Sequence, residues 1–310
     1  MRGKYWLLAI VMAVVVPCSM YRTAELLLIE ETRPTEPALP KPKHTICVQT
    51  EDGNREMELD TYVTGVLLGE MPADFEPEAL KAQAIVARTY TLKSRKHLPA
   101  LVCTDSSCCQ SYCTEEAYLA AGHSGDDLEK IRTAVADTSA LVLTYEGKLI
   151  EATYFSCSGG RTEDALAVWG TDVPYLQSVE SPGEEAAAHY TDTVTFTTEE
   201  FGELLGAEIP KDGWLGKVTY TRGGGVDTVM IAGTPYSGTT VRKRLGLRST
   251  AFVLNQVGNT VTVTTKGFGH RVGMSQYGAD AMAVSGYSCQ EILAHYYPGT
   301  VLEKYSPIIN

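Results

Sequence analysis

The sequence lacks an excess of positive charge. Its 310 residues carry 26 Lys and Arg against 38 Asp and Glu, which gives a net charge of −12. A chain with this balance repels phosphate groups, so the composition disfavours a nucleic-acid-binding protein. It equally disfavours a purely electrostatic attachment to anionic lipid.

Three short patterns that mark common site types are also missing. There is no C-x-x-C pair. Gly is absent two residues before either serine of YFSCSGGRT (154–162), and GFGHRVGMSQYGA (267–279) lacks the lysine of a P-loop. These absences disfavour a serine hydrolase with a nucleophile elbow and a nucleotide phosphate loop. No internal repeat is visible either.

The N-terminus holds an apolar run. Arg2 and Lys4 precede an uncharged stretch from Tyr5 to Tyr21 with no clear cleavage site after it. We interpret residues 1–21 as an uncleaved membrane signal anchor, single-pass, with the rest of the chain extracytoplasmic. A cleaved signal peptide is the alternative. Repeated prolines in residues 22–43 predict an extended tether, so the folded domain is expected at 44–310.

The hydrophobic pattern of the folded part predicts a mixed α+β protein with helices and antiparallel sheet. It indicates a strand at Thr45–Gln49, a short helix at Tyr62–Leu68 that Gly69 ends, and a long helix from Pro77 to about Lys96. A further helix is expected at Asp126–Asp137.

Beyond residue 190 the pattern changes. A capped helix in TTEEFGELLG, a glycine-linked strand pair and a second short helix predict a smaller α/β subdomain inserted at about 191–249. Strands then return, followed by a helix from about Ser275.

One acid, Glu70, follows an apolar run and precedes Met71-Pro72. Poor solvation would raise the pKa of its carboxyl group and suit it to general acid catalysis; a surface acid at a helix end is the alternative. Glycosidases normally need a second carboxylate. The nearby acids crowd a helix start, where the helix dipole already explains them: these are Asp74, Glu76 and Glu78. A single acid suffices only if the sugar's own hydroxyl is the nucleophile.

A cysteine-rich loop follows the long helix. His97, Cys103 and Cys109 are six residues apart and could supply three of the four ligands of a tetrahedral zinc site. Cys108 and Cys113 compete for the same role, and disulfides remain an open alternative in an extracytoplasmic protein. The polar side chains that follow in this loop are expected to face a cleft, and they are Gln110 and Tyr112.

Two glycine-containing loops carry further polar groups that could contact a sugar. The first offers Ser156 and Ser158. In the second, four glycines permit close backbone approach, and the polar side chains are His270, Ser275, Gln276 and Tyr277. Plain turns and a structural histidine are the alternatives.

Several stretches together resemble the SpoIID/LytB family. They are GEMP (69–72), LKAQAIVARTY (80–90), CCQSY (108–112), YFSCSGGRTED (154–164), YLQSVESP (175–182), GFGHRVGMSQYGA (267–279) and ILAHYYPGT (292–300). No single piece is specific, but the set covers nearly the whole of the expected folded domain.

The resemblance implies a lytic transglycosylase that cuts the MurNAc–GlcNAc β-1,4 bond of peptidoglycan and leaves a 1,6-anhydro-MurNAc end. It places the catalytic glutamate at Glu70 and an important arginine at Arg88, where a cation could bind substrate or tune Glu70. It also implies a Zn²⁺ site at His97, Cys103 and Cys109. We expect that zinc to be structural, because a zinc-activated water would give hydrolysis instead.

The resemblance further implies a place and partners. The setting would be engulfment of the forespore in sporulation, between the mother-cell and forespore membranes. The substrate would be glycan strands stripped of peptide by an amidase, stage II sporulation protein P, with the membrane protein stage II sporulation protein M as scaffold. The alternatives are a non-catalytic peptidoglycan-binding scaffold and a zinc-dependent cell-wall hydrolase.

Overall fold

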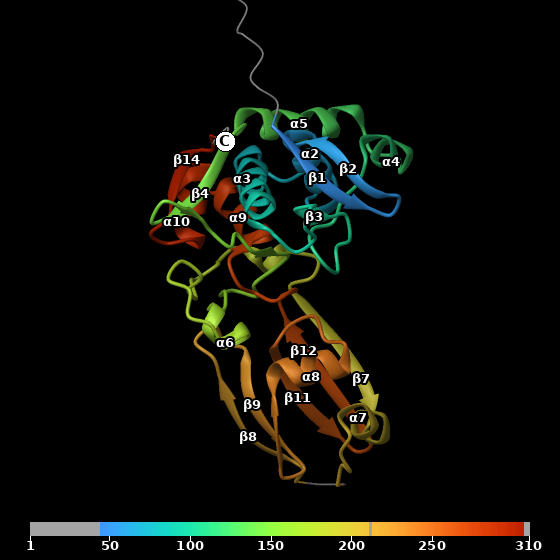
Figure 1. The fold of residues 1–310 in the computed structure, drawn as a ribbon. Helices are drawn as coiled ribbons and strands as arrows, with labels where there is room; N and C mark the ends of the chain where they lie inside the picture. The colour runs from blue at the N-terminus through green and yellow to red at the C-terminus, as the bar shows by residue number, and fades with distance from the viewer. Residues whose placement is uncertain (1–43, 211–212, 307–310) are drawn as a thin grey trace, which may run out of the picture. The chain divides into compact units, whose positions relative to one another are not determined.

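The computed structural model describes residues 44–210 and 213–306 (Figure 1). The predicted signal anchor (1–21) and tether (22–43) lie outside the described residues. Within the described ranges, no helix combines the length and the apolar character needed to span a bilayer.

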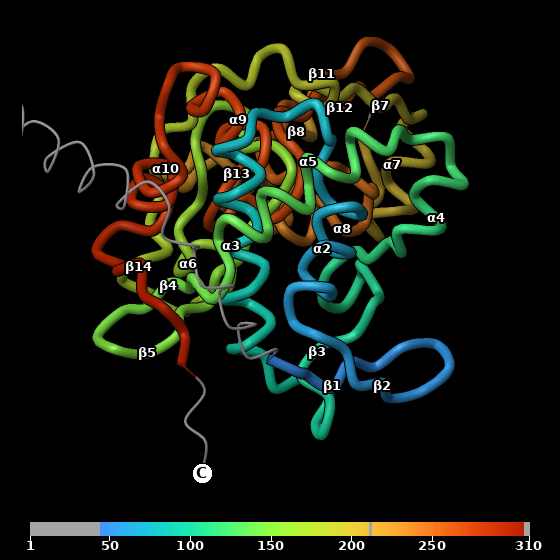
Figure 2. Tube along the Cα trace, turned by 90° about the horizontal axis from the view of Figure 1, so that it is seen from above, coloured from blue at the N-terminus to red at the C-terminus, as the bar shows by residue number. Residues whose placement is uncertain are grey.

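The described residues from His44 to Ser306 form one compact unit with two hydrophobic cores. Five helices build most of the first core, with α3 in contact with each of the others (Figure 2): α2 (Leu59–Glu70), α3 (Pro77–Lys93), α5 (Gly125–Asp137), α9 (Gln276–Val284) and α10 (Cys289–Tyr296). Small side chains let neighbouring helices approach α3 closely, and the buried ones include Ala79, Ala82, Ala84 and Ala87.

Short strands surround the first core. β1 (Thr45–Thr50) pairs antiparallel with β2 (Gly53–Glu58) and parallel with β3 (Val102–Cys103). A second sheet has the order β14-β4-β5, and β6 pairs parallel with β13. Their bounds are β4 (Leu141–Tyr145), β5 (Lys148–Leu149), β6 (Tyr154–Phe155), β13 (Met274–Ser275) and β14 (Val301–Lys304); the short helices α4 (Glu115–Ala120) and α6 (Ala165–Trp169) and a 3₁₀ turn at Glu184–Ala186 complete this part.

The second core lies between two three-stranded antiparallel sheets and two helices. The sheet orders are β10-β9-β8 and β11-β12-β7. The elements are β7 (Thr191–Thr197), α7 (Thr198–Leu205), β8 (Leu215–Tyr220), β9 (Val226–Ile231), β10 (Thr234–Ser237), α8 (Gly238–Leu245), β11 (Ala251–Val257) and β12 (Thr260–Lys266). The subdomain predicted at 191–249 falls here, but the core also takes Phe252 and Val263 from the strands beyond that boundary.

The mixed α+β class is confirmed, and α2 and α3 are the helices whose bounds differ most from the prediction. The helix expected at Tyr62–Leu68 runs from Leu59 to Glu70, because Gly69 continues the helix instead of ending it. The long helix ends at Lys93, where Ser94 turns to extended backbone.

A buried ion pair joins segments that pack on the two cores. Arg271 Nη1 lies 3.2 Å from Glu163 Oε1, and its Nη2 donates to the carbonyl oxygen of Gly223 at 2.7 Å. Glu163 Oε1 also accepts from the amide of Gly225 at 2.9 Å. A Cβ at either glycine would come within 2.5 Å of the Glu163 carboxylate. The glycines between β8 and β9 therefore let this loop reach the pair.

Candidate active site

A cavity of about 540 Å³ opens at the C-terminal end of α2. Its walls come from the cysteine-rich loop, from β6 and the residues beside it, and from the loop before α9. Glu70 is the one Asp or Glu among the described residues that line it. A cavity of this size falls within the usual range for ligand sites. The acid singled out in the sequence thus lies where a ligand can reach it.

Two glycines of α2 bring the cysteine-rich loop against Glu70. Gly65 and Gly69 are four residues apart and share one helix face. A Cβ on Gly65 would lie 2.2 Å from the Tyr112 ring, and one on Gly69 would lie 3.0 Å from the carbonyl carbon of Ser111. The missing side chain at Gly69 therefore permits a close approach. It lets the Ser111 amide donate to Glu70 Oε1 at 2.6 Å.

The cavity changes the acidity of Glu70. Burial raises the pKa of its carboxyl group above the ordinary value, because a poorly solvated carboxylate is disfavoured. Hydrogen bonds from the Ser111 amide and from the side chains of Gln276 and Tyr154 lower the pKa and offset part of this effect. The net shift is upward, the direction that a general acid requires.

Arg88 does not line the cavity. Its side chain is 0% exposed, and its Nε and Nη2 atoms donate to Asp60 Oδ1 at 3.0 and 2.9 Å. Other guanidinium N–H groups donate to the carbonyl oxygens of Val135 and Leu141, both at 3.3 Å. The expectation that Arg88 contacts substrate is wrong, because its donors are committed within the core. Asp60 lies in the first turn of the helix that Glu70 ends, so the pair fixes α2.

Gln110 and Tyr112 are also placed differently from the prediction. Gln110 is 1% exposed; it donates to Thr91 Oγ1 at 3.1 Å and accepts from Tyr154 Oη at 3.2 Å. Tyr112 stacks on the ring of Tyr62, with centroids 5.6 Å apart. Neither lines the cavity, because both are held by buried partners. The loop instead lines it through Ser106, Ser107, Cys108, Cys109 and Ser111.

The two serines after β6 have different surroundings: one lines the cavity and the other is buried. Ser156 lines the cavity as expected. Ser158 is fully buried, and both its amide and its hydroxyl donate to Glu184 Oε2 at 2.8 Å. Ser158 is therefore unable to contact a sugar, since its polar atoms satisfy a buried carboxylate.

His270 lines the cavity between two aromatic rings. Its ring centroid lies 5.6 Å from that of Phe155 and 5.3 Å from that of Trp169. Burial lowers the pKa of His270 to about 4, so the imidazole is neutral at neutral pH. The Val272 amide donates to Nδ1 at 3.1 Å, which leaves the proton on Nε2.

Of the predicted residues at the start of α9, one lines the cavity and two do not. Gln276 lines the cavity, and its Nε2 donates to the backbone oxygen of Glu70 at 3.3 Å. Ser275 is buried and caps α9 by accepting from the Gly278 amide. Tyr277 packs edge-on against Phe75, with centroids 5.0 Å apart. Ser275 and Tyr277 therefore hold the helix and do not line the cavity, which corrects the prediction for both.

Several cavity residues were absent from the sequence prediction, and they include Trp169, Phe268 and Lys96. Trp169 and Phe268 line it with side chains that are 46% and 39% exposed, and Lys96 lines it with a cation. Exposed aromatic faces in a cavity suit the apolar face of a sugar ring. The signal available in the sequence was Trp169 itself, one of only 3 tryptophans.

A cluster of possible metal ligands borders the cavity. The donor atoms of four side chains all lie within 4.8 Å of one another, and they belong to His97, Cys103, Cys108 and Cys109. His97 Nε2 lies 3.3 Å from the Cys108 sulfur and 3.4 Å from that of Cys109. One imidazole and three thiols match the ligands and spacing of a tetrahedral Zn²⁺ site. The predicted trio is brought together, with Cys108 beside it.

The other described cysteines do not join this cluster. The Cys113 thiol donates to the backbone oxygen of Thr114. Cys47, Cys157 and Cys289 are free thiols too, and none of the cysteines in the described ranges forms a disulfide.

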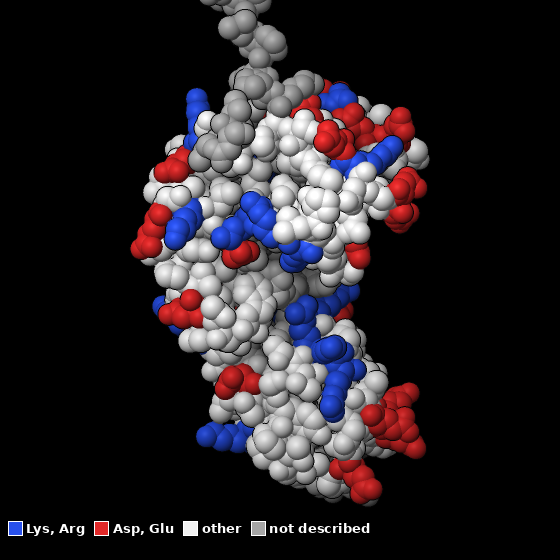
Figure 3. Space-filling view, in the orientation of Figure 1, with Lys and Arg blue, Asp and Glu red and all other residues white. Residues whose placement is uncertain are grey.

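Positive charge gathers locally although the chain as a whole is acidic. Figure 3 shows Lys and Arg side chains gathered across the middle of this face and over α8, with many Asp and Glu side chains toward its ends. α8 carries Arg242, Lys243 and Arg244 in its last turn. The net charge of −12 therefore does not prevent an anionic ligand from approaching locally.

Comparison with known proteins agrees with the sequence resemblance. A family model described as stage II sporulation protein matches residues 49–145. Stage II sporulation protein D of Bacillus amyloliquefaciens is 41% identical over 288 residues, which cover 89% of this chain and 83% of the relative. The chain belongs to the SpoIID family. Stage II sporulation protein D of Bacillus subtilis (strain 168) is 42% identical, over 81% of this chain and 76% of the relative.

The amidase enhancer of Bacillus subtilis (strain 168) is 30% identical, over 78% of this chain and 40% of that relative.

The family model and the two stage II sporulation proteins D confirm the resemblance to the SpoIID/LytB family. The chain is a sporulation protein of the SpoIID family.

Proposed function

We propose that this SpoIID-family protein is a lytic transglycosylase. Its substrate would be the MurNAc–GlcNAc β-1,4 bond of peptide-stripped peptidoglycan. The observation that carries the proposal is that one half-buried carboxyl group, Glu70, with a raised pKa, lines the cavity, and no second carboxylate among the described residues does. Hydrolysis by a carboxylate pair needs two such groups across the bond. One group can serve if the substrate supplies its own nucleophile.

In this mechanism Glu70 acts twice. The protonated carboxyl first donates its proton to the glycosidic oxygen, so the C1–O bond breaks and the GlcNAc hydroxyl leaves. The resulting carboxylate then accepts the proton of the C6 hydroxyl of MurNAc while that oxygen bonds to C1. The products are a free 4-hydroxyl and a 1,6-anhydro-MurNAc end, and Glu70 regains its proton. No water is consumed.

Other cavity residues would position the sugar. The Ser111 amide fixes Oε1 of Glu70, so the second oxygen, Oε2, can face the substrate. The neutral imidazole of His270 also lines the cavity, and its hydrogen bond to the Tyr154 backbone would hold the ring in place beside a bound sugar. The exposed faces of Trp169 and Phe268 suit stacking against a pyranose ring.

We also propose that the cluster beside the cavity binds Zn²⁺ through His97, Cys103, Cys108 and Cys109. Bound there, the metal would crosslink the cysteine-rich loop and fix its path past Glu70. Four protein ligands fill a tetrahedral zinc site and leave no position for a reactive water. The geometry therefore favours a structural zinc over a zinc-dependent cell-wall hydrolase.

The setting of the reaction is proposed from family membership. We place the enzyme at the cell membrane, single-pass, with the folded domain outside the cytoplasm, in forespore engulfment. Stage II sporulation protein P would supply the stripped glycan as an amidase, and stage II sporulation protein M would act as the membrane scaffold.

The direct test is replacement of Glu70. The Glu70→Gln variant of the whole chain should lose about 10²–10⁴-fold of its cleavage rate on stripped glycan, since the amide keeps the shape but carries no transferable proton. Glu116→Gln, at an exposed position of α4, is the matched control and should cleave normally. Full activity in a folded Glu70→Gln protein refutes the proposal. Wall binding by wild type without any anhydro product would favour the non-catalytic scaffold.

A further inference from the structure

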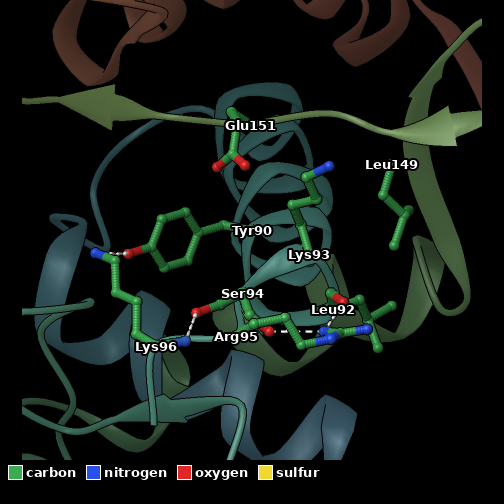
Figure 4. Close-up of a pocket in the computed structure, with 8 residues that line it drawn as sticks. All are labelled: Tyr90, Leu92, Lys93, Ser94, Arg95, Lys96, Leu149 and Glu151. Carbon is green, nitrogen blue, oxygen red and sulfur yellow. Dashed lines mark hydrogen bonds between the residues drawn. The ribbon is translucent and has the colours of Figure 1, made fainter. Parts of the chain in front are cut away.

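Lys96 is the one Lys or Arg among the described residues that line the Glu70 cavity. Its ammonium group donates to Tyr90 Oη and to the backbone oxygen of Cys108, both at 2.9 Å. Figure 4 shows the bond to Tyr90. An ammonium group has three N–H donors, so one donor remains for a ligand.

Both acceptors of Lys96 are neutral groups. No carboxylate forms an ion pair with Lys96 in the part of the chain that the structure describes. The positive charge is therefore held in place by two hydrogen bonds and has no carboxylate partner among the described residues. A cation fixed in this way at a cavity wall is preorganised to bind an anion.

Lys93 provides a comparison within the same segment. It lies in the last turn of α3 and lines a neighbouring cavity but not the one that contains Glu70. Figure 4 shows its ammonium group directed away from the Tyr90–Lys96 pair. The two lysines are three residues apart, yet only Lys96 presents its charge to the candidate active site.

We propose that Lys96 binds a substrate carboxylate, and that this group is the lactyl carboxylate of muramic acid. The proposal rests on the proposed function, because it assumes a muramic-acid glycan in the cavity. In intact peptidoglycan the lactyl carboxyl is tied up in an uncharged amide with the stem peptide. Removal of the stem frees a carboxylate, which can accept a charge-assisted hydrogen bond from Lys96. Lys96 thereby selects glycan from which the stem has been removed.

Three glycans distinguish this carboxylate from those of the stem itself. They are stripped glycan, stripped glycan whose lactyl groups are converted to methyl amides, and glycan that keeps its stems. Binding is measured by calorimetry in the Glu70→Gln background, so that no glycan is cut. We expect stripped glycan to bind roughly tenfold more tightly than the methyl amide, the scale of one hydrogen bond to a charged group. Stem-bearing glycan binding as tightly as stripped glycan would overturn the lactyl assignment.

The variant that tests the residue is Lys96→Met. In this variant the ratio of the affinities for stripped glycan and for the methyl amide should fall from about tenfold to about one, while the affinity for the methyl amide is unchanged. Lys96→Arg should keep most of the preference for stripped glycan. Lys93→Met is the matched control and should keep it. Zinc content is measured alongside, since Lys96 contacts the Cys108 backbone. An unchanged preference for stripped glycan in a folded Lys96→Met protein overturns the proposal.

Cleavage by protein with Glu70 intact separates the two proposals. If that protein cuts no glycan but the preference still depends on Lys96, the transglycosylase assignment fails and the carboxylate site stands. If it cuts glycan normally and Lys96→Met keeps the preference, only the carboxylate site fails.

Discussion

The backbone amide of Ser111 donates a 2.6 Å hydrogen bond to Glu70 Oε1 across 41 residues of sequence. Gly69 makes the approach possible, because a Cβ there would lie 2.9 Å from Ser111 Oγ and 3.0 Å from the carbonyl carbon of Ser111. The cysteine-rich loop thus reaches the carboxyl group through a missing side chain on the helix. The position of the acid and the path of this loop depend on each other.

Gly69→Ala should disturb the contact between the cysteine-rich loop and Glu70. The added methyl group must push Ser111 away from α2, which we expect to cost about 1–3 kcal/mol of unfolding free energy and to reduce kcat. Gly125→Ala, at the start of α5 where a Cβ meets nothing within 4 Å, is the control and should change neither quantity much. Denaturant unfolding and glycan cleavage measure the two effects. Unchanged stability and kcat in Gly69→Ala would show that the contact is not tight.

Arg88 should prove structural. Arg88→Met leaves Asp60 without its partner, and we expect a loss of about 2–3 kcal/mol of unfolding free energy, reduced because Asp60 is partly exposed. The KM of the folded protein for glycan should stay within about twofold, since a group that touches no substrate contributes no ground-state binding. Arg132→Met removes an exposed ion pair and should leave the unfolding midpoint nearly unchanged. A large rise in KM with normal stability would restore Arg88 as a substrate contact.

The pH profile should report the acidity of Glu70. The general acid must be protonated, so activity should fall as pH rises through the raised pKa of Glu70. Tyr154→Phe removes a hydroxyl group whose interaction with Glu70 lowers this pKa, so the alkaline limb of kcat/KM should move to higher pH. Tyr277→Phe, which alters a ring packed against Phe75, should not move it. A limb that stays in place or moves down in Tyr154→Phe would contradict the assigned cause.

The fourth zinc ligand can be tested with two cysteines of the same loop. Wild type and Cys113→Ala should each bind one Zn²⁺ per chain, because the Cys113 thiol is outside the cluster. Cys108→Ala should weaken binding by more than the roughly 10–100-fold that losing an outer-shell partner costs. Competition with a chelator measures both affinities, and retention should fall as pH drops and the ligands are protonated. Equal affinities in the two variants would exclude Cys108 as a ligand.

Local sequence signals were reliable where the deciding partner is near in sequence. Pro77 begins α3 within its first turn, and Thr197 with Glu200 forms a capping box that starts α7. The position of Glu70 after an apolar helix likewise indicated a poorly solvated acid, and burial does raise its pKa.

Signals failed where a distant partner decides the outcome. Ser158 donates a hydrogen bond to Glu184, 26 residues later, and Arg88 donates one to Asp60, 28 residues earlier. Nothing near either residue shows that its polar atoms are already satisfied. Lys96 is the converse case, because an ordinary surface lysine in the sequence becomes the cation of the cavity only when Tyr90 and Cys108 hold it there.

The most direct measurement of the central claim is the fate of solvent oxygen. Stripped glycan is digested by the whole chain in water enriched in ¹⁸O, and the new ends are analysed by mass spectrometry. Because Glu70 is the one carboxylate among the described residues that line the cavity, the C6 hydroxyl should close the sugar. The account predicts 1,6-anhydro-MurNAc ends without ¹⁸O. Reducing MurNAc ends that carry ¹⁸O would show that water is the nucleophile and would contradict it.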